Sequence, residues 1–137
     1  MNGCGKEKMS KILIIDDNRC LAEILDRFLM TFGYPEATLA NDGGEGLLFL
    51  KENPEVALVF TDLAMPNVNG EELIQKSRES GYTGKIILMS GQFPYDVDMA
   101  ACQCRGYRVD AKLPKPFLPH KVLDALTIAG VNPSMFK

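Results

Sequence analysis

Short hydrophobic runs alternate with amphipathic stretches along most of the chain. Two runs, 12–15 and 56–61, are rich in β-branched residues, which is typical of strands buried on both faces. Between such runs, hydrophobic residues recur every three or four positions, which indicates helices. The pattern predicts strands at 12–15, 37–40, 56–61, 85–89 and 109–113, and helices at 21–32, 43–51, 71–80, 95–105 and 119–129.

The first and last predicted helices carry the clearest hydrophobic stripes. The first stops at Gly33, and Pro119 is suited to open the last. The residues predicted to face inward are Leu21, Ile24, Leu25, Phe28, Leu29 and Phe32 in the first helix, and Val122, Leu123, Leu126 and Ala129 in the last.

Five successive strand–helix units imply an α/β fold, with a parallel sheet and helices on both of its faces. The length of 137 residues favours one domain. We expect a flexible leader at 1–10, a folded domain at 11–130 and a C-terminal tail at 131–137.

Composition narrows the possible functions. A net charge of −3 disfavours nucleic acid as a direct partner. No hydrophobic run approaches the roughly 20 residues of a membrane span, and no secretion signal opens the chain, so we expect a cytoplasmic protein without a membrane partner. The four cysteines and the single histidine do not match a disulfide framework or a zinc site.

Polar residues with complementary chemistry follow four of the predicted strands. Ligands of open parallel sheets bind at the carboxyl ends of the strands, so we expect these residues to meet at one edge. They are Asp16 and Asp17 after the first strand, Asp62 after the third, Ser90 and Gly91 after the fourth, and Lys115 after the fifth.

Three neighbouring carboxylates need a cation. Two such groups about 4 Å apart repel by about 4 kcal/mol at an effective dielectric constant of about 20. Oxygen ligands without soft donors favour Mg²⁺, which leaves coordination positions for a phosphoryl oxygen. Lys115 and the Ser90 hydroxyl could hold the other phosphoryl oxygens. Since no serine or cysteine has a neighbouring base, one carboxylate is the expected nucleophile.

These residues lie in segments that resemble the receiver (response regulator) domain of two-component signalling. The segments are IIDDN at 14–18, LVFTDLAMPNVNG at 58–70, ILMSG at 87–91 and KPF at 115–117. The resemblance covers about residues 11–129. It implies a flavodoxin-like (βα)5 fold with strand order 2-1-3-4-5.

The resemblance also implies a role for each site residue. Asp62 is the expected phosphoryl acceptor. Asp16, Asp17 and Asp62 with the Ala64 carbonyl would surround Mg²⁺. Ser90, Gly91 and Lys115 would contact the phosphoryl group, and a cis peptide would join Lys115 and Pro116. A histidine kinase or histidine phosphotransfer protein would be the donor, and phosphorylation would change a face that binds an unidentified downstream protein.

Three features depart from the usual receiver pattern. Lys112 stands at the output-face position that is usually aromatic. The stretch between Ser90 and Lys115 is a few residues longer than usual, so we expect an altered fourth helix or altered loops beside it. Ala64 and Gln92 stand where the family tunes dephosphorylation, and because Ala64 cannot orient water, we expect the aspartyl phosphate not to be among the fastest to decay.

Other interpretations remain open. Asp16 or Asp17 could simply cap the following helix. An aspartate-nucleophile phosphohydrolase would have a related fold, but it needs an aspartate where this chain has Asn18. A flavin or nucleotide binder would need a phosphate loop rich in glycine or serine after the first strand, and the acidic residues there have the wrong charge. We therefore expect the chain to be a signalling switch that catalyses only its own phosphorylation and dephosphorylation.

Overall fold

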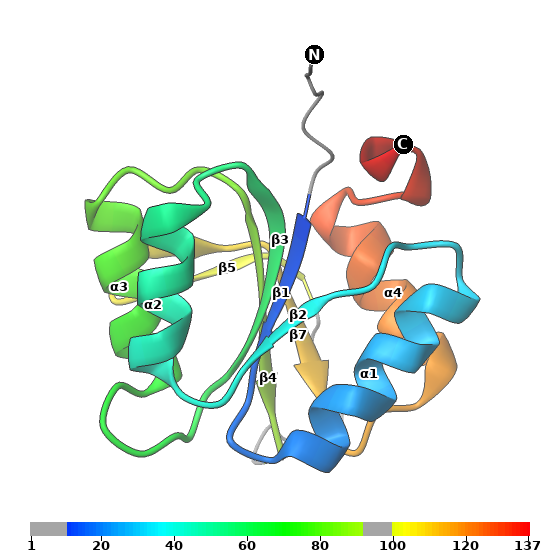
Figure 1. Ribbon diagram of the computed structural model, residues 1–137, viewed down its shortest axis with the longest axis horizontal. Helices are drawn as coiled ribbons and strands as arrows, with labels where there is room; N and C mark the ends of the chain where they lie inside the picture. The colour runs from blue at the N-terminus through cyan, green and yellow to red at the C-terminus, as the bar shows by residue number, and fades with distance from the viewer. Residues whose placement is uncertain (1–10, 92–99) are drawn as a thin grey trace.

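Strands and helices alternate along the chain in the computed structural model, which describes residues 11–91 and 100–137 (Figure 1). The elements are β1 (Lys11–Ile15), α1 (Arg19–Thr31), β2 (Thr38–Ala40), α2 (Gly43–Glu52), β3 (Val56–Asp62), α3 (Gly70–Glu79), β4 (Lys85–Ser90), β5 (Cys102–Cys104), β6 (Tyr107–Val109), β7 (Ala111–Pro114), α4 (Pro119–Ala129) and the 3₁₀ helix η1 (Pro133–Phe136).

The central sheet has five parallel strands in the order β2-β1-β3-β4-β7. This order confirms the expected 2-1-3-4-5 arrangement of the main strands. Figure 1 shows the sheet between two helical layers, with α2 and α3 on one face and α1 and α4 on the other. All carboxyl ends therefore lie at one edge, where ligands of such sheets bind.

Side chains of the central strands alternate between two hydrophobic clusters. In β1, Ile12 and Ile14 pack with α1 and α4, whereas Leu13 and Ile15 pack with α2 and α3. All four side chains are almost completely buried. Because both faces of β1 are covered, the sequence of this strand is a continuous run of hydrophobic residues.

Three of the described α-helices begin at a side chain that accepts a hydrogen bond from the first helical turn. Asn18 accepts from the Leu21 N–H at 3.2 Å, Asp42 from Glu45 at 2.8 Å and Asn69 from Glu72 at 2.9 Å. Because Asn18 caps α1, neither Asp16 nor Asp17 is needed for that purpose.

A β-hairpin stands where the sequence predicted the end of a helix. The predicted helix at 95–105 is wrong at Cys102–Cys104, which is a strand antiparallel to β6; the residues at 92–99 lie outside the described part. Polar Gln103 and Arg108 alternate with less exposed neighbours in both strands, a strand period rather than a helical one. The hairpin packs on the same face of the sheet as α3.

Two residues predicted to face inward are substantially exposed. Ile24 in α1 and Leu123 in α4 each expose 43% of their surface. Ala22 and Ala125 are buried at neighbouring positions instead. Each helix buries only a limited stripe of its surface, and Ala22 and Ala125 lie on that stripe whereas Ile24 and Leu123 lie beside it.

The segment after α4 packs against the body of the protein. Phe136 in η1 is 3% exposed, and its ring meets that of Tyr34 edge-on, with the ring centres 5.6 Å apart. The Tyr34 hydroxyl donates a hydrogen bond to the Val131 carbonyl at 3.3 Å. The loop after α1 and the segment after α4 therefore hold each other in place.

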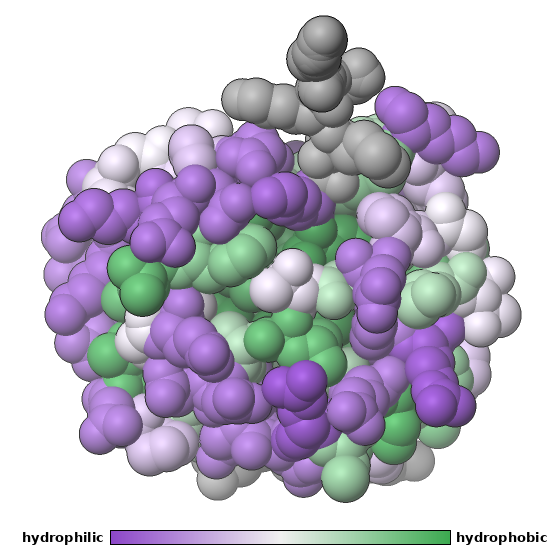
Figure 2. Space-filling view, viewed as in Figure 1, coloured by the Kyte–Doolittle hydropathy of each residue, from purple (hydrophilic) through white to green (hydrophobic). Residues whose placement is uncertain are grey.

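Figure 2 shows a mostly hydrophilic face, with hydrophobic residues visible between the two helical layers. None of the helices in the described residues is both long enough and hydrophobic enough to span a bilayer.

Candidate functional site

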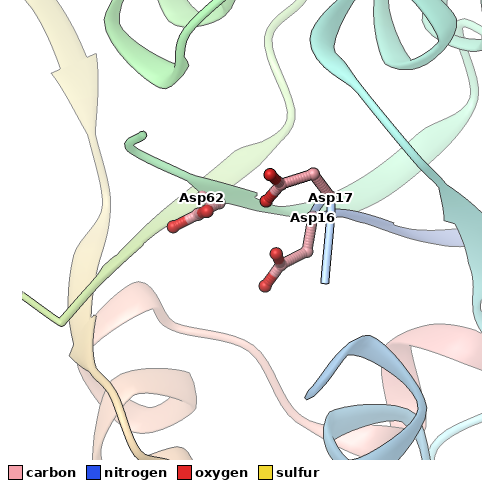
Figure 3. A group of neighbouring side chains, drawn as sticks. All are labelled: Asp16, Asp17 and Asp62. Atoms are coloured by element: carbon pink, nitrogen blue, oxygen red, sulfur yellow. The ribbon is translucent and has the colours of Figure 1, made fainter. Parts of the chain in front are cut away.

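The carboxyl ends of β1 and β3 bring three aspartates together. Asp16 and Asp17 follow β1 directly, and Asp62 is the last residue of β3. One carboxylate oxygen from each lies within 4.8 Å of the other two. Figure 3 shows the three carboxyl groups side by side at the ends of these strands. The predicted acidic cluster is therefore present in the structure.

The three acids differ in exposure. Asp16 is 1% exposed and Asp62 is 6% exposed, whereas Asp17 is open to solvent. The backbone holds the buried pair firmly: the Asp16 N–H donates to the Ala40 carbonyl at 3.1 Å, and the Leu63 N–H donates to the Met89 carbonyl at 2.9 Å. The cluster thus combines two buried carboxylates, those of Asp16 and Asp62, with the exposed carboxylate of Asp17.

Lys115 supplies a positive charge to the two buried acids. Its Nζ lies 2.8 Å from Asp16 Oδ2 and 3.2 Å from Asp62 Oδ1. The Lys115 N–H donates to the Ser90 carbonyl at 2.9 Å, which places the lysine beside the end of β4. The peptide bond from Lys115 to Pro116 is cis.

Burial and neighbouring charges shift two pKa values in the site. Burial raises the pKa of Asp62 above its usual range, and the negative charges of Asp16 and Asp17 raise it further; the Lys115 ammonium acts in the opposite direction. The pKa of Lys115 is also raised, because its contacts with Asp16 and Asp62 outweigh the effect of its burial.

The remaining predicted residues lie in β4, in β7 and in the loops that follow β3 and β4, and they differ in burial. Ser90 is buried at the end of β4. Gly91 follows it and lies beside Lys115: a Cβ atom added at residue 91 would be 3.9 Å from the Cβ of Lys115. Ala64 is exposed in the loop after β3. Lys112 lies opposite Leu88 in β7 and is half-buried. Gln92 lies outside the described residues.

Gly70 holds the end of the loop after β3 close to the backbone of that strand. Its N–H donates to the Leu63 carbonyl at 2.9 Å, and a Cβ at this position would collide with the Asp62 carbonyl oxygen. The first turn of α3 is therefore packed directly against the backbone of Asp62 and Leu63.

Sequence reasoning missed a second charged cluster at the opposite end of β4. Asp110 is 5% exposed, and its carboxylate accepts a hydrogen bond from the Ile86 N–H at 2.9 Å. Arg78, Arg108 and Lys85 place their cationic groups 3.3, 3.0 and 4.0 Å from it. The polar Arg108 between the less polar Tyr107 and Val109 could have indicated strand β6, but no sequence motif indicates the charged cluster around Asp110.

The fold and this set of strand-end residues define a class of α/β proteins whose sheet edge carries acids and a lysine. The chain belongs to the family of response regulator receiver domains, which it matches over residues 12–127. Members of this family act in phosphorylation-dependent signalling and are not conventional enzymes, and they generally bind Mg²⁺.

Individual relatives agree with this membership. The chain is 29% identical over 117 residues to a chemotaxis protein CheY homolog of Campylobacter jejuni, covering 85% of this chain and 88% of the relative. It is 33% identical over 113 residues to the response regulator MprA of Mycobacterium leprae, covering 82% of this chain and 47% of MprA.

A solved structure supports the fold. The chemotaxis protein CheY4 of Vibrio cholerae superposes with a TM-score of 0.72 at 24% identity, covering 88% of this chain and 98% of CheY4.

Proposed function

We propose that this chain accepts a phosphoryl group on Asp62 from a histidine kinase or a histidine phosphotransfer protein and thereby changes a face that binds a downstream protein. The observation that carries the proposal is the meeting of Asp16, Asp17 and Asp62 within 4.8 Å, with the Lys115 ammonium at hydrogen-bonding distance from two of them.

The donor set fits Mg²⁺. All three side chains offer carboxylate oxygens, which are the ligands that this hard cation prefers. The exposed Asp17 leaves the cluster open to solvent on one side, which suits an ion that keeps several waters. The ion would be held by Asp16, Asp17, Asp62 and the Ala64 carbonyl. When bound, it would neutralise negative charge during phosphoryl transfer.

Asp62 has the position required of the nucleophile. An oxygen of its carboxylate forms the new bond to phosphorus, while the bond from phosphorus to the donor's imidazole nitrogen breaks and the nitrogen keeps the electron pair. Burial makes the Asp62 carboxylate less stable as a free anion, which the raised pKa reflects.

Lys115, Ser90 and Gly91 would receive the transferred group. The Lys115 ammonium lies 3.2 Å from Asp62 Oδ1, so it can neutralise an added phosphoryl oxygen with a small movement. Ser90 is buried at the end of the strand next to β3, and the Gly91 backbone adjoins Lys115. These three residues would offer the phosphoryl group on Asp62 a positive charge, a hydroxyl group and the polar groups of the Gly91 backbone.

The added charge of about −2 is expected to reorganise the elements that contact the site. Ser90 ends β4, and Lys112 lies in the neighbouring strand β7. A lysine in place of the usual aromatic residue gives this face a charged switch position. We propose that the change is read by a protein partner.

The test is incubation with acetyl phosphate and Mg²⁺, followed by intact mass measurement and peptide mapping. We expect one phosphoryl adduct on Asp62, which chelation of Mg²⁺ prevents and Asp62→Asn abolishes. Asp124→Asn, an exposed aspartate of α4, is the matched control and should be labelled like the unmodified chain. Labelling on serine or histidine, or undiminished labelling of Asp62→Asn, would overturn the assignment.

A further inference from the structure

The first turn of α2 meets the loop after β3 at a position without a side chain. Gly43, the first residue of α2, is buried, and a Cβ added to it would collide with the Val68 carbonyl oxygen. The same atom would lie 2.7 Å from Cβ and 2.8 Å from Cγ1 of Val68. Carbon atoms in contact are about 3.5–4.0 Å apart, so a side chain at residue 43 would displace either the loop or the helix.

The same turn of α2 is attached to the end of β1. Gly46 is buried as well, and a Cβ added to it would lie 2.9 Å from Cγ1 of Ile15, so the helix backbone rests directly on this strand. The side chain of Asp42 accepts a hydrogen bond from the Glu45 N–H at 2.8 Å and fixes the start of the helix. Because β1 is itself paired with strands on both sides, an atom added at Gly43 would shift the loop rather than the helix.

The loop that α2 contacts carries the expected carbonyl ligand of the metal. Its two ends are joined, because the Gly70 N–H donates to the Leu63 carbonyl at 2.9 Å. Between them, Met65 is 8% exposed and packs into the hydrophobic cluster on the α2 and α3 face, whereas Ala64 is exposed. Since the ends are held, a displacement of Val68 would be passed to the other residues of the loop, which include Ala64.

The first turn of α2 thus contacts both segments that carry the acidic site. Ile15 immediately precedes Asp16, and Val68 belongs to the loop that begins after Asp62. Mg²⁺ requires near-ideal octahedral geometry, with ligands at about 2.0–2.1 Å. A shift of a few tenths of an ångström between the two segments would therefore change how well they share this ion.

We propose that Gly43 is a positioning residue for the metal and phosphoryl site, because its missing side chain lets α2 set the distance between the end of β1 and the loop after β3. The inference rests on the proposed function, since it concerns the same Mg²⁺ site. It adds a residue outside the ligand set, which offers the ion no side chain and acts only through Val68.

Gly44 offers a matched control within the same helical turn. It is exposed, and a Cβ added to it would meet only Asp42 Oδ1, at 3.4 Å. Neither Gly43 nor Gly44 has a positive φ, so alanine fits the backbone at both positions. Gly43→Ala and Gly44→Ala add the same methyl group and the same gain in helix propensity. They differ in the collision with Val68.

The experiment compares the unmodified full chain with the two alanine variants by NMR of their backbone amides. In chelator, we expect Gly43→Ala to shift the resonances of residues 63–69 and Gly44→Ala to leave them unchanged. On titration with magnesium chloride, Gly43→Ala should bind Mg²⁺ about tenfold more weakly than the unmodified chain, at the lower end of the range for residues that orient metal ligands. Gly44→Ala should bind it like the unmodified chain.

A second substitution tests whether the effect passes through Val68. Val68→Gly removes both close side-chain atoms and lets the carbonyl move aside. Gly43→Ala should therefore weaken Mg²⁺ binding less in the Val68→Gly background than in the unmodified chain. The double variant relieves the collision and so remains available if Gly43→Ala alone does not fold; its Mg²⁺ affinity should still be lower than that of Val68→Gly.

Two kinds of failure are distinguishable. Equal Mg²⁺ affinity in Gly43→Ala and Gly44→Ala, or unchanged loop resonances in Gly43→Ala, would overturn the inference. Absence of Mg²⁺ binding by the unmodified chain would instead contradict the proposed function.

Discussion

The ammonium of Lys115 lies 2.8 Å from the carboxylate of Asp16, whose side chain is completely buried. Asp16 otherwise accepts a hydrogen bond from the Asn18 N–H at 2.9 Å. The lysine therefore compensates a buried charge in the resting protein, in addition to its proposed contact with a phosphoryl group. The two roles can be separated, because the first is measurable without phosphorylation.

Replacing the lysine should destabilise the fold. Lys115→Met leaves the Asp16 carboxylate buried without its cation, which we expect to lower the free energy of unfolding by about 3 kcal/mol. Urea denaturation in the presence of a chelator measures the change. Lys51→Met, on the exposed side of α2, is the control and should change stability by less than about 0.5 kcal/mol. An equally small loss in Lys115→Met would contradict this account of the ion pair.

Magnesium should stabilise the folded chain through the same cluster. At a concentration of about 100 times its Kd, a ligand that binds only the folded state adds about 2.7 kcal/mol to the free energy of unfolding. We expect the midpoint of urea denaturation to rise with Mg²⁺ and to return to its starting value on chelation. Asp17→Asn should abolish most of this rise. Asp124→Asn should keep it, and a full response in Asp17→Asn would exclude Asp17 as a ligand.

The raised pKa of Asp62 predicts how its removal affects stability. Burial, with the charges of Asp16 and Asp17, makes the ionised carboxylate unfavourable in the fold. A carboxyl pKa that is higher in the folded state means that stability falls as pH rises from the usual aspartate range through the raised value. In chelator at pH 7, Asp62→Asn should therefore be more stable than the unmodified chain by roughly 1 kcal/mol, a typical size for a single substitution.

Acidification provides the check. The stability advantage of Asp62→Asn should shrink as pH falls through the raised pKa, because the carboxyl group of the unmodified chain then becomes neutral as well. Urea denaturation of both proteins across this range follows the difference, and Asp124→Asn should show no such trend. A lower stability of Asp62→Asn at pH 7 would mean that the Lys115 contact dominates over burial.

Much of the fold and the acidic site was predictable because both depend on local patterns. The hydrophobic runs of β1 and β3 set the sheet, and parallel topology then brings Asp16, Asp17 and Asp62 to one edge. The hairpin was not predictable in the same way, since its strands are three residues long and its stability depends on contacts with α3, such as Tyr107 with Glu79.

The cluster around Asp110 illustrates the same limit. Arg78 and Asp110 are 32 positions apart, and their contact arises only when the hairpin folds back onto α3. Arg78 Nη1 donates to the Tyr82 carbonyl at 3.0 Å and the Gly84 carbonyl at 2.8 Å, and Nη2 donates to the Arg108 carbonyl at 3.1 Å. None of these acceptors is a side chain, so no residue pattern marks them.

Arg78 should be a major contributor to stability. Its side chain is 8% exposed and joins α3, the following loop and β6. Arg78→Met removes these hydrogen bonds and one partner of the buried Asp110, which should cost about 3–5 kcal/mol of unfolding free energy. Urea denaturation measures the loss. Arg27→Met is the matched control, because Arg27 is exposed on α1, and a comparable loss there would show that any arginine replacement has this effect.

The lifetime of the proposed aspartyl phosphate should depend on Ala64. This residue is exposed two positions after Asp62, and its methyl group cannot hydrogen-bond an attacking water. Ala64→Asn supplies an amide at that position, so we expect the phosphoryl group to be lost several times faster, which is less than the roughly 10²–10⁴-fold that a positioned proton-transfer group typically contributes.

Ala64→Val separates hydrogen bonding from size. The protein is phosphorylated with acetyl phosphate and Mg²⁺, the donor is removed, and intact mass follows the decay. Ala64→Val should decay no faster than the unmodified chain, because valine adds bulk beside Asp62 without a polar group. If Ala64→Asn decayed at the rate of the unmodified chain or more slowly, hydrolysis would not be limited by the orientation of water at this position, and Ala64 would have no part in setting the duration of the signal.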